Sequence, residues 1–313
     1  MNSAGYAMIG AVVKGSLLTL ALFFLYSTIP FLGAFAGIFV PLPCIYYSLK
    51  YQRVTGYAIV LLMLFTLALL DASSVLQYLV LSAVCSLVLP EFLARGKGSI
   101  RSLFYTAGLN ALLVAVLAVI AVVLFNVDID GHMRATIHDA ISQVGETYRQ
   151  SSLTGQELQG LEDGLRVTEK FFVRMYPSVF LIFLAILAGS NLIMLRRLSG
   201  SLGKDISFGT FSLYRNPDFL VWLVIVAGFT LLTDSTVLTT IALNVLVVLY
   251  CLYFVQGLAV SLWFAKKIKL SRVLQAIFYA LLALQPLLTI VVALFGLTDL
   301  WANFRARNKK ENL

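Results

Sequence analysis

The sequence has little charge for its length, and this scarcity already excludes most classes of protein. Asp, Glu, Lys and Arg make up only 12% of the 313 residues, whereas 60% are hydrophobic. A soluble domain is about 45–50% apolar and covers its surface with polar groups that this chain does not have. The composition therefore excludes a soluble enzyme, a coiled coil and a disordered chain.

Cysteine, histidine and the usual catalytic motifs are also scarce or missing. Cys44, Cys85 and Cys251 lie far apart within apolar runs, without a CxxC or a Cys/His pair. Buried free thiols are therefore expected, and neither a disulfide nor a zinc site. The sequence contains no GxGxxG, P-loop, HExxH or GxSxG motif. We predict no catalytic residue, metal or cofactor, so active transport would need an ion gradient or a separate ATPase.

Long apolar runs are what the chain has instead, and they predict an all-α, polytopic transmembrane helical bundle. A spanning helix takes about 20 apolar residues, so roughly 188 apolar residues can fill about nine spans. Charges and breaks divide the sequence into nine runs, with eight or ten spans as alternatives. The runs are Ala11–Tyr26, Phe31–Ser48, Tyr57–Leu70, Val75–Leu93, Leu103–Phe125, Met175–Leu195, Phe219–Leu232, Val237–Ala265 and Val273–Leu297.

Basic residues gather in alternate loops, which predicts the orientation in the membrane. With Lys14 in the cytoplasm, the loops on its side hold 14 bases and three acids, while the turns at Asp71 and Asp234 hold no base. Because Lys and Arg are enriched in cytoplasmic loops, the net charge of +8 reports orientation and gives no support for nucleic-acid binding. We expect a membrane protein with a cytoplasmic N-terminus.

A polar stretch, 127–172, interrupts the apolar runs and carries eight acids and four bases, which places it outside the cytoplasm. Ser151, Ser152 and Gly155 mark a turn, and Thr154 with Glu157 has the spacing of a capping box. The stretch therefore predicts a helical hairpin, either a lid over an outward-facing cavity or a structured connector. Its first half places apolar residues at helical spacing: Met133, Ile137, Ile141, Val144 and Tyr148.

Four side chains near the start of this hairpin are of metal-ligand types, but a solvated loop and helix start is the favoured interpretation. They are Asp128, Asp130, His132 and His138.

By topology the chain divides into the first five spans (1–126), the hairpin (127–172), the remaining spans (173–298) and a basic amphipathic tail (299–313). Nine spans would place this tail outside, although it carries Arg305, Arg307, Lys309 and Lys310. A bend near Gln285–Pro286, a division of the Val237–Ala265 run, or a weakly enforced last loop would each remove the conflict.

Polar and small residues within the runs are the candidates for a site. Side-chain amides are costly in hydrocarbon unless they are paired, so they either line a small-molecule cavity or join helices. The cavity candidates are Asn110, Asn191, Asn244 and Gln256. Small residues at a spacing of four allow close helix approach, either inside the protein or with a membrane protein partner through the first helix. These docking candidates are Ala7, Ala11, Gly15, Gly33 and Gly37.

Three short patterns resemble the YybS-like family of uncharacterised bacterial polytopic membrane proteins. They are Pro41-Leu42-Pro43, the stretch from Tyr253 to Ala259, and the closing set of Gly296, Asp299, Trp301, Phe304 and Arg305. The resemblance to this family implies a location in the bacterial cytoplasmic (inner) membrane. The family is distantly similar to S components of energy-coupling-factor transporters. This resemblance implies six helices with both termini inside, a vitamin-sized ligand near the outer face, and docking on a coupling subunit. The hairpin and three further spans are departures from a minimal S component.

Two functions remain open at this stage. The first is a solute-binding or transport component without its own ATPase, with the lipid bilayer, a small-molecule ligand and a membrane protein as partners. The alternative is a non-transporting scaffold that docks partner proteins. A membrane-embedded enzyme ranks third, because the spans show no acid/base or metal constellation.

Overall fold

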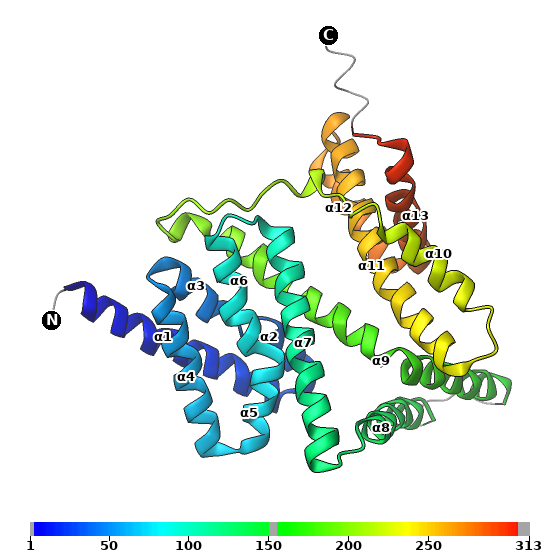
Figure 1. Cartoon of the computed structure of the whole chain (residues 1–313), viewed down its shortest axis with the longest axis horizontal. Helices are drawn as coiled ribbons and strands as arrows, with labels where there is room; N and C mark the ends of the chain where they lie inside the picture. The colour runs from blue at the N-terminus through cyan, green and yellow to red at the C-terminus, as the bar shows by residue number, and fades with distance from the viewer. Residues whose placement is uncertain (1–2, 150–154, 306–313) are drawn as a thin grey trace, which may run out of the picture. The chain divides into compact units, whose positions relative to one another are not determined.

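The computed structural model describes residues 3–149 and 155–305, and the regular elements within these ranges are all helices. The chain forms two compact units. The first unit comprises Met1–Val119 and Phe183–Gly209, and the second comprises Ile120–Ile182 and Thr210–Leu313. Two long helices, α7 (Ser99–Phe125) and α9 (Gln156–Arg197), contribute to both units (Figure 1). The predicted all-α fold is confirmed.

The first unit is built on α1 (Ser3–Thr28), α4 (Arg53–Leu70) and the last part of α9. The helix that follows α4 changes type along its length: α5 (Ala72–Tyr78) passes through a π-helical segment, η1 (Leu79–Ala83), into α6 (Val84–Ala94). A short 3₁₀ turn, η2 (Ser199–Ser201), follows α9. Two clusters form the core, one around Ile45, Leu89 and Leu195 and the other around Phe23, Ile59 and Tyr78.

The predicted second span, Phe31–Ser48, is not one helix. It consists of α2 (Pro30–Ile38) and α3 (Leu42–Lys50), each of nine residues. Pro41 lacks the N–H that would continue α2, and its ring would clash with the carbonyl one turn earlier. Nine residues rise only about 14 Å, so neither helix alone crosses a hydrocarbon core of about 30 Å.

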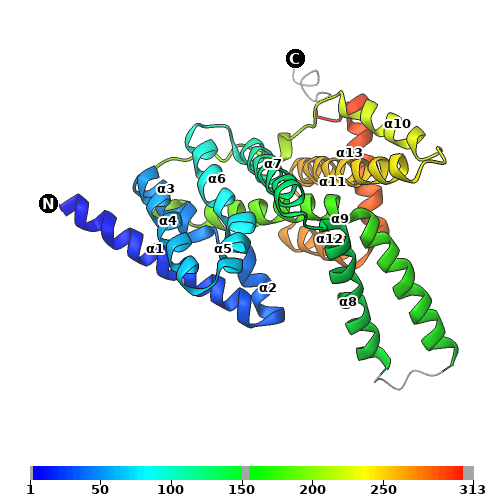
Figure 2. The same ribbon diagram turned by 60° about the horizontal axis from the view of Figure 1, so that its bottom comes forward.

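The second unit contains α8 (Ile129–Arg149), the 3₁₀ turn η3 (Phe211–Leu213), α10 (Leu220–Thr230), α11 (Thr236–Lys267), α12 (Arg272–Leu284) and α13 (Pro286–Ala302). The arms of the predicted hairpin are α8 and the start of α9 (Figure 2). The second arm continues without interruption into the following span, as one helix of 42 residues. The predicted turn at Ser151, Ser152 and Thr154 lies outside the described residues.

α13 lies against α11 and runs in the same direction along it. The middle of α11 contacts the early part of α13, as in the Tyr250–Thr289 hydrogen bond of 2.6 Å. Further along both, Gln256 forms a hydrogen bond with Asp299, and the ring of Phe264 contacts that of Phe304, just after α13. Because α11 and α13 are parallel, the chain must return from the end of α11 to the start of α13 through α12. The break at Gln285–Pro286, where the two helices are bent by 111°, allows this return.

Within the described residues, six helices are long and apolar enough to cross a membrane, or seven if the bent pair α12–α13 counts as one span. The predicted count of nine is therefore not confirmed. Three predicted runs account for the difference. Phe31–Ser48 is divided, α10 has only 11 residues, and Val273–Leu297 is bent at Pro286.

Candidate functional site

The four side-chain amides predicted to line a cavity lie in separate places. Asn110 and Asn191 belong to the first unit and Asn244 and Gln256 to the second. Asn110 is buried on α7, and its side-chain oxygen has no hydrogen-bond partner among the described residues. The Nδ2 of Asn191 donates to the carbonyls of Ile38 (2.7 Å) and Leu187 (2.8 Å). Asn191 thus satisfies the last carbonyl of α2, where the helix ladder ends.

Asn244 joins α11 to α9 beside a proline. Its Oδ1 accepts the backbone N–H of Ser178 at 3.0 Å, and its Nδ2 donates to the carbonyl of Arg174 at 2.8 Å. In a regular helix these two backbone groups would pair with each other. Pro177 lies between them in the sequence, so the amide of Asn244 supports the ladder of α9 where proline disturbs it.

Gln256 is the centre of a buried polar network in the second unit. Its Oε1 accepts the backbone N–H of Asn216 at 2.9 Å, and its Nε2 donates to Asp299 Oδ2 at 3.1 Å. The same Asp299 oxygen pairs with the guanidinium of Arg305, which also donates to the carbonyl of Tyr214 at 2.6 Å. The network therefore holds the segment before α10 and the end of α13 against α11.

Two glycines allow this network to form at a close crossing of α11 and α13. A Cβ on Gly257 would lie 1.9 Å from the carbonyl oxygen of Val292, and one on Gly296 would lie 2.0 Å from that of Tyr253. No residue other than glycine fits such backbone contacts without separating the helices.

The small residues of the predicted docking face make contacts inside the first unit. A Cβ on Gly15 would lie 2.5 Å from Ile59 Cδ1, and one on Gly37 would lie 2.7 Å from the ring of Tyr26. A Cβ on Gly33 would lie 2.5 Å from the backbone oxygen of Leu25. Ala11 is buried, whereas Ala7 is exposed. Docking of a partner through the first helix stays a prediction.

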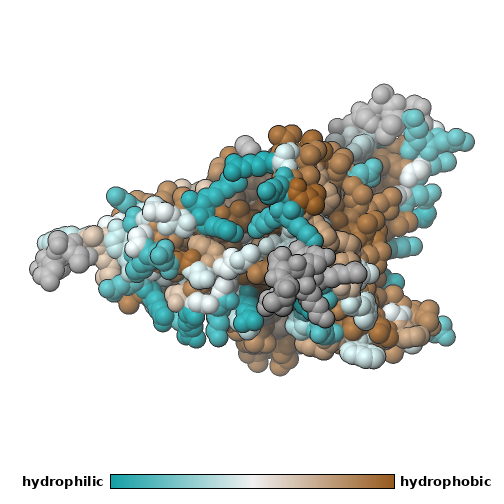
Figure 3. Space-filling view, turned by 90° about the horizontal axis from the view of Figure 1, so that it is seen from above, coloured by the Kyte–Doolittle hydropathy of each residue, from teal (hydrophilic) through white to brown (hydrophobic). Residues whose placement is uncertain are grey.

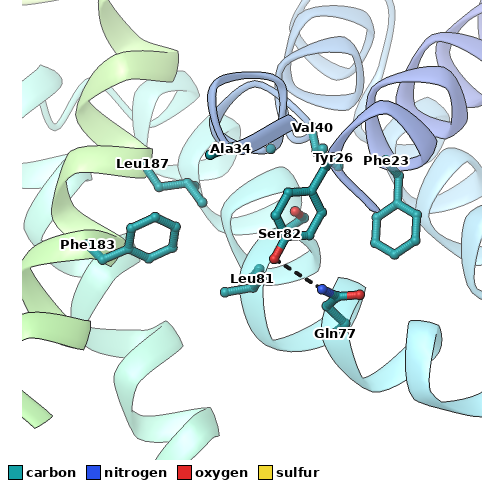
Figure 4. A pocket seen from close by; sticks show the side chains of 10 residues that line it. Phe23, Tyr26, Ala34, Val40, Gln77, Leu81, Ser82, Phe183 and Leu187 are labelled. Carbon is teal, nitrogen blue, oxygen red and sulfur yellow. Dashed lines mark hydrogen bonds between the residues drawn. The ribbon is translucent and has the colours of Figure 1, made fainter. Parts of the chain in front are cut away.

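A cavity of about 160 Å³ lies in the first unit, and none of the four predicted amides lines it. Figure 4 shows Tyr26 from α1 and Gln77 from α5 joined across its wall by a hydrogen bond, in which Gln77 Nε2 donates to the Tyr26 hydroxyl at 3.1 Å. The π-helical segment contributes Leu81 and Ser82, and α9 contributes Phe183. The wall is thus mostly apolar, with three polar side chains.

This cavity lies toward the end of the unit that holds the turn between α4 and α5. Gln77 is six residues beyond Asp71, whose carboxylate caps α5 by accepting the backbone N–H of Ser74 at 3.0 Å. The hydroxyl of Ser73 also donates to this carboxylate and holds the pKa of Asp71 below its usual value. Asp71 is therefore charged at neutral pH, as expected of a turn at a water interface.

The basic loops of the first unit meet at its other end. Arg53 and Arg95 both pair with Glu91, and Lys204 Nζ donates to the carbonyl of Tyr51 at 3.1 Å. Ser99 binds the carbonyl of Phe208. Figure 3 looks onto this end, where hydrophilic side chains gather. Three loops that are distant in sequence are thus on one face, as the charge pattern requires.

The hairpin's polar residues have structural contacts. Asp128 accepts the N–H of Gly131 at 2.9 Å at the start of α8, and Asp130 pairs with Arg134. His138 Nδ1 lies 2.9 Å from Glu169 of α9. No group of three or more His, Cys, Asp and Glu side chains in the described ranges is placed to hold a metal ion.

A family model described as a predicted membrane protein (DUF2232) matches residues 17–300. The chain belongs to this family. No curated protein and no solved structure matches it. The DUF2232 match covers the cavity, the Asn244 contact and most of the Gln256 network, including Asp299.

The sequence missed two main features of this DUF2232 member. Asp299 is 1% exposed, but it lies near the end of an apolar run and was assigned to the tail. The sequence also does not predict the cavity at Tyr26 and Gln77, because tyrosine and glutamine are common near the ends of membrane spans. A usable signal was the cluster of Gly296, Asp299 and Arg305, which lie on neighbouring turns.

Proposed function

We propose that the chain is a solute-binding component of a membrane transport system and that the cavity of the first unit is its binding site. The observation that carries this proposal is the mixed lining of the cavity: an apolar wall with Tyr26, Gln77 and Ser82 as its polar groups. Ligand sites are typically apolar with a few placed polar groups. The π-helical segment that lines it adds support, since such segments are frequent at functional sites.

The size and chemistry of the cavity define the class of ligand. An engineered apolar cavity of about 150 Å³ binds benzene, so about 160 Å³ suits a single ring or a molecule of similar size. The amide of Gln77 and the hydroxyls of Tyr26 and Ser82 favour a ligand with one or two hydrogen-bonding groups. The ligand is therefore a small, uncharged and mainly apolar molecule.

The orientation in the membrane is part of the proposal. Positive loops lie in the cytoplasm, which places the basic end of the first unit inside and the Asp71 end, with the cavity, toward the outer face. This arrangement agrees with the resemblance to YybS-like proteins and to S components. The sequence has no P-loop, so transport would depend on an ion gradient or on a partner ATPase.

The experiment compares benzene, phenol and benzamide as ligands of the purified full chain, read as a rise in the unfolding temperature. Ala34→Phe fills the cavity and abolishes the rise for all three compounds. Gln77→Leu keeps the rise for benzene but weakens the binding of benzamide roughly three- to tenfold, the value of one lost hydrogen bond.

The matched control is Leu69→Phe, which adds the same ring at an exposed position of α4 outside the cavity and leaves all three responses unchanged. The proposal is wrong if none of the compounds stabilises the native chain, or if Ala34→Phe responds as the native chain does. A chain that binds none of them but copurifies with a stable membrane protein would favour the scaffold alternative.

A further inference from the structure

The bent pair α12–α13 forms an apolar groove with α11 in the second unit. The groove has a volume of about 380 Å³. Ser261 of α11 and Phe278 of α12 line two of its sides, and Val291, Leu294, Phe295 and Thr298 of α13 line the third. Five of these six side chains carry methyl groups or rings, so the groove suits a hydrocarbon chain.

The apolar lining of the groove is itself exposed. On α13, the lining residues Val291 and Leu294 are 60% and 55% exposed. Together, α12 and α13 are long and apolar enough to form a membrane segment. A groove bordered by such side chains within a membrane opens onto lipid, because water would leave this surface unfavourably exposed.

A dense group of bases lies at one end of the groove. The ring of Phe295 in the groove contacts the ring of Phe264, with centroids 6.0 Å apart. Two residues after Phe264, the segment 266–272 begins, and it holds four bases and no acid. These bases, which form the basic collar, are Lys266, Lys267, Lys269 and Arg272.

The charge of the collar decides which lipid fits. A headgroup with a net negative charge is attracted by about 1 kcal/mol for each nearby Lys or Arg, whereas a zwitterionic headgroup also presents a cation that the collar repels. We propose that the groove binds an anionic phospholipid, with an acyl chain between α12 and α13 and the phosphate at the basic collar. This inference concerns the second unit alone and does not depend on the cavity of the first.

Trp263 is a built-in reporter, because its ring lies 5.4 Å from Lys267 Nζ in the collar. The full chain with Trp222→Phe and Trp301→Phe keeps Trp263 as its tryptophan. It is reconstituted in phosphatidylcholine vesicles with increasing phosphatidylglycerol, where one or the other lipid is brominated on its acyl chains. We expect bromine on phosphatidylglycerol to quench Trp263 as if this lipid were enriched about fivefold or more.

Two variants test the two parts of the site. Replacing all four collar bases with Gln lowers the enrichment of phosphatidylglycerol near Trp263 to about one, which means no preference over phosphatidylcholine. Thr298→Phe, which fills the groove and leaves the collar intact, reduces quenching by both brominated lipids, whereas Leu287→Phe on an exposed face of α13 does not.

The matched charge control replaces four exposed bases of the first unit, Lys97, Arg101, Arg196 and Arg197, with Gln and keeps the enrichment. Equal quenching by the two lipids in the native chain would overturn the proposal. An equal loss of phosphatidylglycerol enrichment in the control and collar variants would also overturn it, because overall charge and not this site would then select the lipid. Unchanged elution of every variant as a single species shows that folding is retained.

Discussion

The side chain of Asn244 takes part in the backbone hydrogen bonding of a neighbouring helix. Because its amide serves both Ser178 N–H and the Arg174 carbonyl, Asn244→Leu leaves two polar groups without this partner beside Pro177. We expect a loss of about 1 kcal/mol in stability, because two hydrogen bonds are lost and each contributes about 0.6 kcal/mol between helices of a membrane protein. Thermal unfolding of the purified chain measures it as a lower midpoint.

Asn244→Asp separates the two bonds, because a carboxylate still accepts from Ser178 N–H but cannot donate to the Arg174 carbonyl. Its midpoint should fall below that of the native chain. Ile241→Leu, at an exposed position of the same helix, is the control and keeps the native midpoint. If Asn244→Leu also kept it, the bridge would contribute nothing to stability.

At the scale of helices, the crossing of α11 and α13 depends on Gly257 and Gly296. Ala at either position places a methyl carbon about 2 Å from a backbone oxygen of the other helix, so the helices must move apart. Overpacking of this kind costs about 1–3 kcal/mol. We predict a lower unfolding midpoint for Gly257→Ala and for Gly296→Ala, and a weakened Gln256–Asp299 bond.

Gly228 of α10 provides the comparison, because a Cβ there would meet nothing within 4 Å. Gly228→Ala should leave the midpoint unchanged or raise it slightly, since Ala favours the helix by about 1 kcal/mol over Gly. Equal effects at Gly228 and Gly257 would show that helix propensity, and not the crossing, governs the result.

Long apolar runs predict helices even where a proline lies inside the helix, as Pro90 does in α6 and Pro177 in α9. Six of the nine predicted runs lie within the six helices that are long and apolar enough to cross a membrane. Phe31–Ser48 and Val273–Leu297 failed because hydropathy counts apolar residues, whereas a proline such as Pro41 or Pro286 ends the helix without lowering the count. The bend at Pro286 was foreseen as one of three alternatives.

Side-chain partners were harder to predict than helices. Each buried amide was recognised as needing a partner, but the partner depends on which helices pack together. Gln256 meets Asp299 only because Gly257 and Gly296 bring α11 and α13 into contact. Such tertiary contacts are not encoded in the period of one helix. The sequence therefore leaves open whether an amide lines a cavity or joins helices, and the structure places Asn191, Asn244 and Gln256 in contacts between helices or loops.

At the scale of the whole molecule, the return at Pro286 removes the conflict between nine spans and a basic tail. Arg305 binds the carbonyls of Ser212 and Tyr214. Both acceptors lie next to Arg215 in the second unit, so Arg305 lies at the same end of this unit as Arg215. In the proposed orientation, which follows the positive-inside rule, this end lies in the cytoplasm.

This topology predicts which single cysteines are labelled from outside the cell. In a variant with Cys44, Cys85 and Cys251 replaced by Ser, a cysteine at exposed Gln143 of the hairpin reacts with a membrane-impermeant maleimide in intact spheroplasts. Cysteines at Arg197 and Ala302 react only after permeabilisation. A topology of nine spans places Ala302 outside, so labelling of Ala302→Cys before permeabilisation would contradict the return at Pro286. Labelling of Arg197→Cys in intact spheroplasts would instead contradict the proposed orientation. Reaction of all three cysteines after permeabilisation is the control, because it shows that each site is accessible to the maleimide.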